Sequence, residues 1–342
     1  MNRLLKIFIF CFTGIPFTGF TQDFTFSQFY EKPLLRNPAL AGVFKGDIRV
    51  AAAYRSQWGS VTVPFKTTAV SIENKFPIGG SNDFLTVGLQ MSADVAGDIR
   101  LKRTQLLPTI NYHKSINGEK DEYISVAFMG GVAGNQFDPT QMKLADQWRN
   151  GEFNQANGTM QRIDRTGYSY WDAATGISYS SSFGEDARFY LGAALYHFNK
   201  PKVAFNNVNE DVYLQERLMI NAGFNMPVSD YTNIVAFADY MIQGGNRQFL
   251  AGAMYGMNLN RYYDDPDPTT LYFGTFMRWG DALMPMTKLD MKHMSIALSY
   301  DINISKLHVA SYWRGGFELT AAFRSFLKIR NSTLDKVRCV RF

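Results

Sequence analysis

The residues best suited to chemistry in this chain are charged side chains of both signs that recur on one face of its alternating stretches. They are Arg49, Arg55, Glu73, Lys75, Arg103, Asp172, Asp239, Arg278, Asp301, Glu318 and Arg324. If that face lined a closed lumen, each charge would need a partner or water, because an unpaired buried charge is costly. The charges either line a solute pore or form a network that holds a plug or solvates the interior. A selective pore commonly carries rings of one sign, so the mixed signs favour the network.

The polar residues offer one arrangement for nucleophilic catalysis and one for metal binding, and both are weak. His293 shares a face with Ser295 and Ser299, but no third group that would orient the histidine is evident. Residues 264–268 hold three carboxylates, yet their spacing matches no calcium loop and two prolines stiffen it. The glycines of residues 130–134 do not lead into a helix, as those of a phosphate-binding loop would. We therefore expect no enzyme, no metal site and no cofactor.

The element that would position the charged side chains is a strand with one apolar and one polar face. In residues 293–302, apolar positions alternate with small, polar or ionisable ones, and a period of two is typical of a strand. The apolar positions are Met294, Ile296, Leu298, Tyr300 and Ile302. We expect these side chains to face lipid, and His293 and Asp301 to face the lumen.

The same alternation recurs through most of the chain and predicts thirteen strands. They are residues 47–57, 68–76, 84–95, 103–112, 123–131, 167–180, 188–198, 217–226, 231–243, 247–258, 270–279, 293–302 and 315–324. Single-chain bacterial barrels have even strand numbers, so we expect fourteen, with twelve next, and residues 303–311 as the candidate for a missed strand. Residues 136–166 are polar and unpatterned, which is typical of a long outward loop in such a barrel.

The composition agrees with a membrane barrel. Only 19% of the 342 residues are charged and 15% are aromatic, while the mean hydropathy is −0.18. No run approaches the roughly 18 apolar residues that a spanning helix needs. Lipid-facing and lumen-facing residues alternate along barrel strands, which keeps the mean hydropathy unremarkable. We therefore predict an all-β fold, an antiparallel transmembrane β-barrel of the outer membrane with long extracellular loops.

The N-terminus has the features of a cleavable export signal. Arg3 and Lys6 precede the apolar residues 7–12, and residues 19–21 form a small-x-small end. Cleavage would lower the net charge from +5 to +3, because it removes those two cations and no acid. So small a net positive charge argues against nucleic acid as a partner. The mature chain would keep only Cys339 and could form no internal disulfide.

These features divide the chain into four segments. We expect a signal peptide (residues 1–21), a lead-in segment (22–46), the barrel (47–326) and a C-terminal tail (327–342). Pro33 and Pro38 interrupt the lead-in, so it is not expected to form a strand pair. We expect it to be tucked in or under a barrel mouth.

Four places in the sequence resemble one known family. Residues 26–30 (FSQFY) with 37–42 (NPALAG) resemble its opening motif, and residues 54–58 (YRSQW) and 198–205 (FNKPKVAF) resemble two internal motifs. Residues 299–305 with 316–319 resemble its closing strands. The matching positions are Phe26, Ser27, Gln28, Asn37, Pro38, Gly42, Tyr54, Arg55, Gln57, Trp58, Phe198, Asn199, Pro201, Phe205, Tyr300, Asp301 and Glu318. The family is PorP/SprF, type IX secretion system membrane proteins of Bacteroidota.

The resemblance implies an outer-membrane β-barrel without enzymatic activity that works with type IX secretion. In gliding relatives such proteins support export or surface attachment of a large adhesin. The implied partners are outer-membrane lipid, a large secreted or surface protein, and other type IX components. Two departures are Phe317, where the family commonly has His, and the ending Cys339-Val340-Arg341-Phe342, which lacks the family's proline. Patterning alone leaves a passive porin or solute channel as the alternative.

Overall fold

The structure is a computed structural model that describes most of the chain. The described residues are 23–79, 82–117, 121–160, 164–183, 187–205, 212–259, 268–306 and 308–327. The expected signal peptide, nearly all of the expected tail and most of the acidic residues 264–268 lie outside them.

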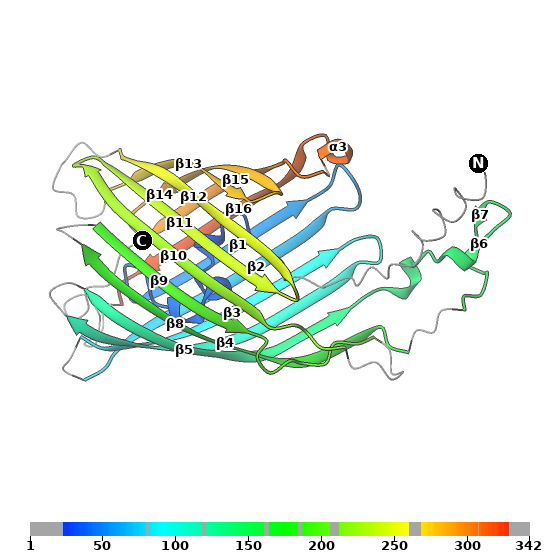
Figure 1. The fold of residues 1–342 in the computed structure, drawn as a ribbon, viewed down its shortest axis with the longest axis horizontal. Coiled ribbons are helices and arrows are strands. Elements are labelled where there is room, and N and C mark those ends of the chain that lie inside the picture. Colours follow the sequence, from blue (N-terminus) through cyan, green and yellow to red (C-terminus); the bar gives the residue numbers. More distant parts are fainter. Residues whose placement is uncertain are drawn as a thin grey trace, which may run out of the picture.

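Fourteen antiparallel strands close into a barrel, as the sequence predicts (Figure 1). They are β1 (Ile48–Gln57), β2 (Phe65–Pro77), β3 (Phe84–Ala96), β4 (Leu101–Asn117), β5 (Glu122–Gln136), β8 (Gly167–Phe183), β9 (Ala187–Tyr196), β10 (Arg217–Ser229), β11 (Thr232–Gln243), β12 (Asn246–Asn258), β13 (Thr270–Arg278), β14 (Ala282–Asp290), β15 (Met294–Asn303) and β16 (Arg314–Ser325). Each pairs with its sequence neighbour in the barrel, and β1 closes the ring against β16. Among the described residues, no helix is long and apolar enough to cross a membrane.

The fourteenth strand is not where the sequence analysis expected it. Apart from Asn303, the last residue of β15, residues 303–311 form a connection that contains the short helix α3 (His308–Ser311). The missed strand is β14, in which Met284 and Met286 are buried, Pro285 between them is half-buried and Leu283 before them is exposed. Because both of its faces are apolar, β14 lacks the period-two contrast that identified the other strands.

The β15 strand shows how the wall is built. Met294, Ile296, Leu298 and Tyr300 are exposed on the outside, whereas the residues between them are buried toward the interior. Asp301 faces inward as expected, but the prediction for His293 is wrong. His293 lies exposed in the turn before β15, where its Nδ1 lies 3.2 Å from the carbonyl oxygen of Arg324. The strand begins one residue later than the alternation suggested, so the histidine never enters the wall.

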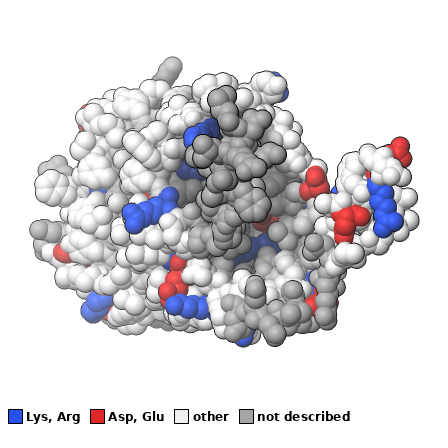
Figure 2. Space-filling model, turned by 45° about the vertical axis from the view of Figure 1, so that its right-hand side comes forward, with Lys and Arg blue, Asp and Glu red and all other residues white. Residues whose placement is uncertain are grey.

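The two ends of the barrel differ. One end, here called the long-loop end, carries the connections 58–64, 97–100, 137–166, 197–216, 244–245, 279–281 and 304–313. The other, the short-turn end, carries mostly brief turns, and there the chain enters β1 and leaves β16. Within 137–166, the two-residue strands β6 (Trp148–Arg149) and β7 (Glu152–Phe153) form a hairpin that projects beyond the barrel (Figure 1). Seen obliquely from this end, the surface is mostly uncharged, with scattered groups of both signs (Figure 2).

The outward face of β15 leads to a testable prediction about membrane insertion. Leu298 is near the middle of β15 and 54% exposed, so Leu298→Arg places a cation against hydrocarbon. We expect a loss of about 2–4 kcal/mol in the free energy of unfolding from lipid vesicles. Urea titration, followed by the heat-modifiable band on unboiled gels, measures this loss. Leu298→Met is the matched control and should leave stability nearly unchanged; equal stability of the Arg variant would contradict a lipid-facing position.

Candidate functional site: a lumen filled by residues 23–46

The interior of the barrel is occupied by residues 23–46, which we call the plug. It contains three short helical turns, η1 (Phe29–Glu31), α2 (Pro33–Arg36) and η2 (Pro38–Leu40). Pro33 and Pro38 each stand at the first helical position, where the missing N–H costs nothing. The Asn37 side chain accepts a hydrogen bond from Ala39 N at 2.8 Å and so starts η2. The prolines therefore shape the plug as a chain of turns rather than strands.

The plug passes through the whole lumen. Asp23 contacts side chains at the long-loop end of β4, β9 and β10, whereas Gly42 contacts Glu73 near the short-turn end of β2. The sequence predicts a segment in or under one mouth of the barrel, whereas the structure shows that the plug extends from one end of the lumen to the other. Most plug side chains from residue 26 onward are buried along this path, so the plug packs against the wall of the lumen.

The first group of contacts holds the Phe26-Ser27-Gln28 motif. Glu318 of β16 is 0% exposed, and its carboxylate accepts hydrogen bonds from Ser27 N at 2.7 Å and Gln28 N at 3.0 Å. The Ser27 hydroxyl donates to Asp301 at 2.5 Å. The Gln28 amide donates to the Glu318 carbonyl at 2.9 Å and accepts from the Thr320 hydroxyl at 2.6 Å. The wall thus binds Ser27 and Gln28 through both their backbone N–H groups and their side chains.

Arginines of the wall balance these carboxylates. Arg55 lies 2.8 Å from Asp301 and 3.8 Å from Glu318, and it also donates to the carbonyl of Thr25. Arg278 approaches Asp301 at 3.6 Å and Asp281 at 2.8 Å. The two acids and two arginines therefore form one network, and the plug backbone is part of it.

A second anchor is the pair of Arg36 with Asp239 of β11. The Nε and Nη2 atoms of Arg36 meet the two carboxylate oxygens at 2.8 and 2.5 Å, and Nη1 donates to the Tyr190 hydroxyl at 2.5 Å. The Arg36 guanidinium also lies 5.1 Å from the ring centroid of Phe29. A forked, planar contact of this kind is the strongest geometry for a buried ion pair.

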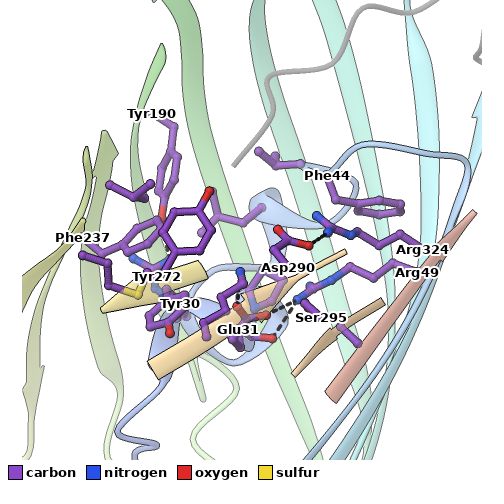
Figure 3. Close-up of a pocket in the computed structure, with 18 residues that line it drawn as sticks. Tyr30, Glu31, Phe44, Arg49, Tyr190, Phe237, Tyr272, Asp290, Ser295 and Arg324 are labelled. Carbon is purple, nitrogen blue, oxygen red and sulfur yellow. Dashed lines mark hydrogen bonds and ion pairs between the residues drawn. The ribbon is translucent and has the colours of Figure 1, made fainter. Parts of the chain in front are cut away.

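A third anchor lies nearer the short-turn end, beside a cavity of about 70 Å³ (Figure 3). Glu31 bonds Lys288 at 2.6 Å and Arg49 at 3.2 Å, and Arg49 also bonds Glu73 at 3.2 Å. Figure 3 shows Glu31 directed at Arg49 across this space. On the other side Tyr30 stacks on Phe237 with 4.9 Å between ring centroids. The cavity is thus enclosed by groups that already have partners.

Asp23 closes the plug at the long-loop end. Its carboxylate contacts Arg103 at 2.6 Å, His197 at 2.7 Å and Arg217 at 2.9 Å. The other ring nitrogen of His197 contacts Asp172 at 2.7 Å.

Small residues make room for the plug. Gly42 has φ +86°, and a Cβ there would lie 2.1 Å from the Thr86 hydroxyl oxygen. A Cβ on Gly176 of β8 would lie 2.0 Å from the side-chain oxygen of Asn37. Asn37 in turn donates to the carbonyl of Ile177 at 3.1 Å. Both the plug and the wall therefore need glycine where they meet.

Eight of the eleven charged residues on the polar strand face are the ones predicted to face the lumen, and the structure places them around the plug. They are Arg49, Arg55, Glu73, Arg103, Asp239, Arg278, Asp301 and Glu318. Seven are buried, and Arg103 is half-buried. Their polar partners are mostly each other or plug residues, and Arg278 also pairs with Asp281 in the connection after β13. The network also includes groups that the strand pattern does not indicate, namely Asp23, Glu31 and Arg36 of the plug and Lys288 and Tyr190 of the wall. The signal for the plug side is the charge of the lead-in, which holds two acids and three bases within 25 residues.

The remaining motif residues lie at the long-loop rim. Trp58 and Gln57 are half-buried where β1 ends, and Tyr54 lies on the outer face. The Asn199 amide donates to the carbonyl of Trp171 at 2.7 Å, and the ring of Phe205 meets that of Tyr168 at 4.7 Å. The 198–205 motif therefore folds the 197–216 connection back onto β8, with Pro201 buried and Phe198 exposed.

The structure does not assemble the histidine and serines considered for catalysis. Ser299 accepts a hydrogen bond from the Gln28 amide at 3.1 Å in the lumen, while His293 is exposed in its turn. Within the described part of the chain, no group of three or more His, Cys, Asp or Glu side chains is arranged to hold a metal ion.

The anchors make the plug's stability measurable. Arg36→Ala leaves the Asp239 carboxylate buried without its partner, so we expect about 3–5 kcal/mol of destabilisation. Lys200→Ala is the matched control, because Lys200 and Glu216 form an exposed pair at 3.3 Å that contributes about 1 kcal/mol or less. Urea unfolding and hydrogen exchange of residues 23–46 measure both effects. Equal, small changes in the two variants would show that the plug is not held by this pair.

Comparisons with known proteins bear on the identity of this plugged barrel. No curated protein matches the chain. Among solved structures, it is similar to a FadL homologue from Pseudomonas aeruginosa, with 8% identity, a TM-score of 0.49, and coverage of 89% of this chain and 99% of that one. It is also similar to the TodX monoaromatic hydrocarbon channel deltaS2 mutant, with 10% identity, a TM-score of 0.45, and coverage of 87% and 94%.

The family comparison is more extensive. Residues 18–323 match the family described as type IX secretion system membrane protein PorP/SprF. That span includes the plug and nearly all of the barrel, and every motif position given above lies within it. The chain belongs to the PorP/SprF family of type IX secretion system membrane proteins.

Proposed function

We propose that this protein is a non-enzymatic, plugged barrel of the outer membrane that supports export or surface attachment of a large partner protein during type IX secretion. The short-turn end faces the periplasm and the long-loop end faces outward, because outer-membrane barrels have short periplasmic turns and longer outer loops. Other type IX components contact it from the periplasm. In a gliding host the partner is an adhesin.

The observation that carries the proposal is the lumen filled by residues 23–46. A porin needs a water-filled path, and its lumen charges would be hydrated and free to select ions. Here Arg55, Asp239 and Glu318 are committed to ion pairs and to the plug backbone. This commitment supports a closed scaffold over a solute channel.

The outer surface offers a place for a large partner. In the 137–166 connection, Trp148 is 53% and Met160 is 96% exposed. Hydrogen bonds within this connection hold residues 146–160 together. Asp146 accepts one from Met160 N at 2.7 Å and one from the Thr159 hydroxyl at 2.8 Å. These hydrogen bonds lower the pKa of Asp146, which therefore stays ionised and keeps accepting them. Exposed apolar groups on an ordered arm are typical of a protein-binding surface.

Single-channel recording separates the scaffold from the porin. In planar bilayers we expect the purified protein to show no large, stable conductance, because the plug fills its lumen. Arg36→Ala should give brief openings as the plug loosens, whereas Lys200→Ala should behave like the unmodified protein. A porin inserted in the same bilayers confirms that open pores are detected. A large, steady conductance of the unmodified protein would favour the porin alternative.

The partner prediction is tested in cells. Deleting the gene should remove at least one large protein from the surface or the medium, and the complete gene should restore it. Replacing Trp148 and Met160 together by Ser should leave the barrel in the membrane but reduce the partner's surface level. Val212→Ser, an exposed position on the 197–216 connection, is the matched control. If the deletion strain loses no cargo, the secretion role is wrong; purification in mild detergent then identifies what the barrel does bind.

A further inference from the structure

Two lysines lie in one row on the outer wall at the long-loop end. Lys66 of β2 is in register with Val95 of β3, and Val95 is in register with Lys102 of β4. Neighbouring strands are about 4.8 Å apart, so the two lysine Cα atoms are about 10 Å apart, with only a valine between them. Two flexible side chains at this spacing can place their ammonium groups on one ligand.

A groove lies at this row. It has a volume of about 680 Å³ and is lined by the two lysines, Val95, Pro64 and Arg100 among others. Arg100 belongs to the turn between β3 and β4 and is exposed, with φ +49°. The groove therefore presents three cations from three consecutive segments of the wall.

The two lysines of the groove are not neutralised by the described part of the protein. Neither forms an ion pair or a side-chain hydrogen bond with another described residue, whereas Arg100 lies near enough to Asp138 to help lower the pKa of that carboxyl. Asp138 also lines the groove, and its Oδ1 is occupied by hydrogen bonds from the Thr140 amide at 3.0 Å and hydroxyl at 2.6 Å. Asp98 lies in the same turn as Arg100 and is exposed. Positive charge still exceeds negative charge at the groove.

The wall next to the row is apolar. Below Lys102, the next outward side chains of β4 are Thr104, Leu106, Pro108 and Ile110, all of them exposed. At about 3.3 Å per residue, Leu106 lies about 13 Å along the strand from Lys102. Ile72 of β2 is exposed on the same outer face. Cations thus lie directly above hydrocarbon-facing side chains, at the depth where a lipid has its headgroup.

We propose that Lys66, Arg100 and Lys102 bind the phosphate of a phosphorylated glycolipid in the outer leaflet. Its acyl chains lie along Ile72, Leu106 and Ile110. Charge complementarity identifies the headgroup, because a neutral lipid would leave both lysines unpaired at a membrane surface. The inference rests on the proposed orientation only for the choice of leaflet.

Lipid retention by the purified full-length protein tests the site. The protein is placed in phosphatidylcholine nanodiscs containing phosphorylated lipid A, extracted in mild detergent and analysed by native mass spectrometry. The variant that combines Lys66→Gln and Lys102→Gln should retain about thirty-fold less lipid A, since each lysine near an anionic surface raises the affinity about five-fold. The variant that combines Lys66→Arg and Lys102→Arg should still retain lipid A. Lys114→Gln removes a 58% exposed cation from the other end of β4 and should change nothing.

Three results would overturn the proposal. All variants could retain lipid A equally, or the unmodified protein could retain dephosphorylated lipid A equally well. Inorganic phosphate alone could also displace lipid A completely, which would indicate an anion site only. The heat-modifiable band confirms that each variant is folded. Protease access to residues 137–166 on intact cells reports the orientation separately. Failure of the lipid site is therefore distinguishable from failure of the secretion role.

Discussion

The structure depends on the pairing of charges inside the lumen. Arg36 with Asp239, and Arg55 with Asp301 and Glu318, are all buried, so each member needs its partner. Breaking one such pair costs far more than an exposed pair contributes, because it leaves a charge in a medium that solvates it poorly. Barrel closure and plug insertion are therefore coupled: the wall charges are tolerated because the plug supplies their partners.

This coupling explains why the plug motifs are short and specific. Glu318 binds the backbone N–H groups of Ser27 and Gln28, so the motif is recognised partly through its main chain. The wall gives up side-chain volume where the plug approaches, as Gly176 does for Asn37. The plug is held in place by buried apolar side chains such as Phe29 and Leu40 and by this polar network, in which the loss of one member weakens the others.

The outer surface follows different physics from the lumen. Its apolar face meets lipid, its long-loop end projects an ordered arm with exposed Trp148, and the wall below that end carries the row of Lys66 and Lys102. Most lumen charges are paired with one another or with the plug, the buried Lys32 ammonium being an exception, whereas Lys66 and Lys102 form no ion pair with a residue that the structure describes. Protein contact and lipid contact thus belong to the outside of the molecule, and the inside maintains the scaffold.

The sequence by itself determined the strands, their inward and outward faces and the strand number, because the period-two pattern is a local property of the chain. Leu298 outward and Asp301 inward follow from neighbouring residues alone. The pattern does not identify β14, because the plug-facing Met284 and Met286 make both of its faces apolar. It also misplaces His293, because the strand begins later than the alternation does.

Only the tertiary structure decided which charges meet. Arg36 and Asp239 are 203 positions apart, and Lys66 faces Lys102 across one strand only through the register of β2, β3 and β4. Contacts of this kind depend on barrel closure and on the path of the plug, and no local pattern in the chain encodes them.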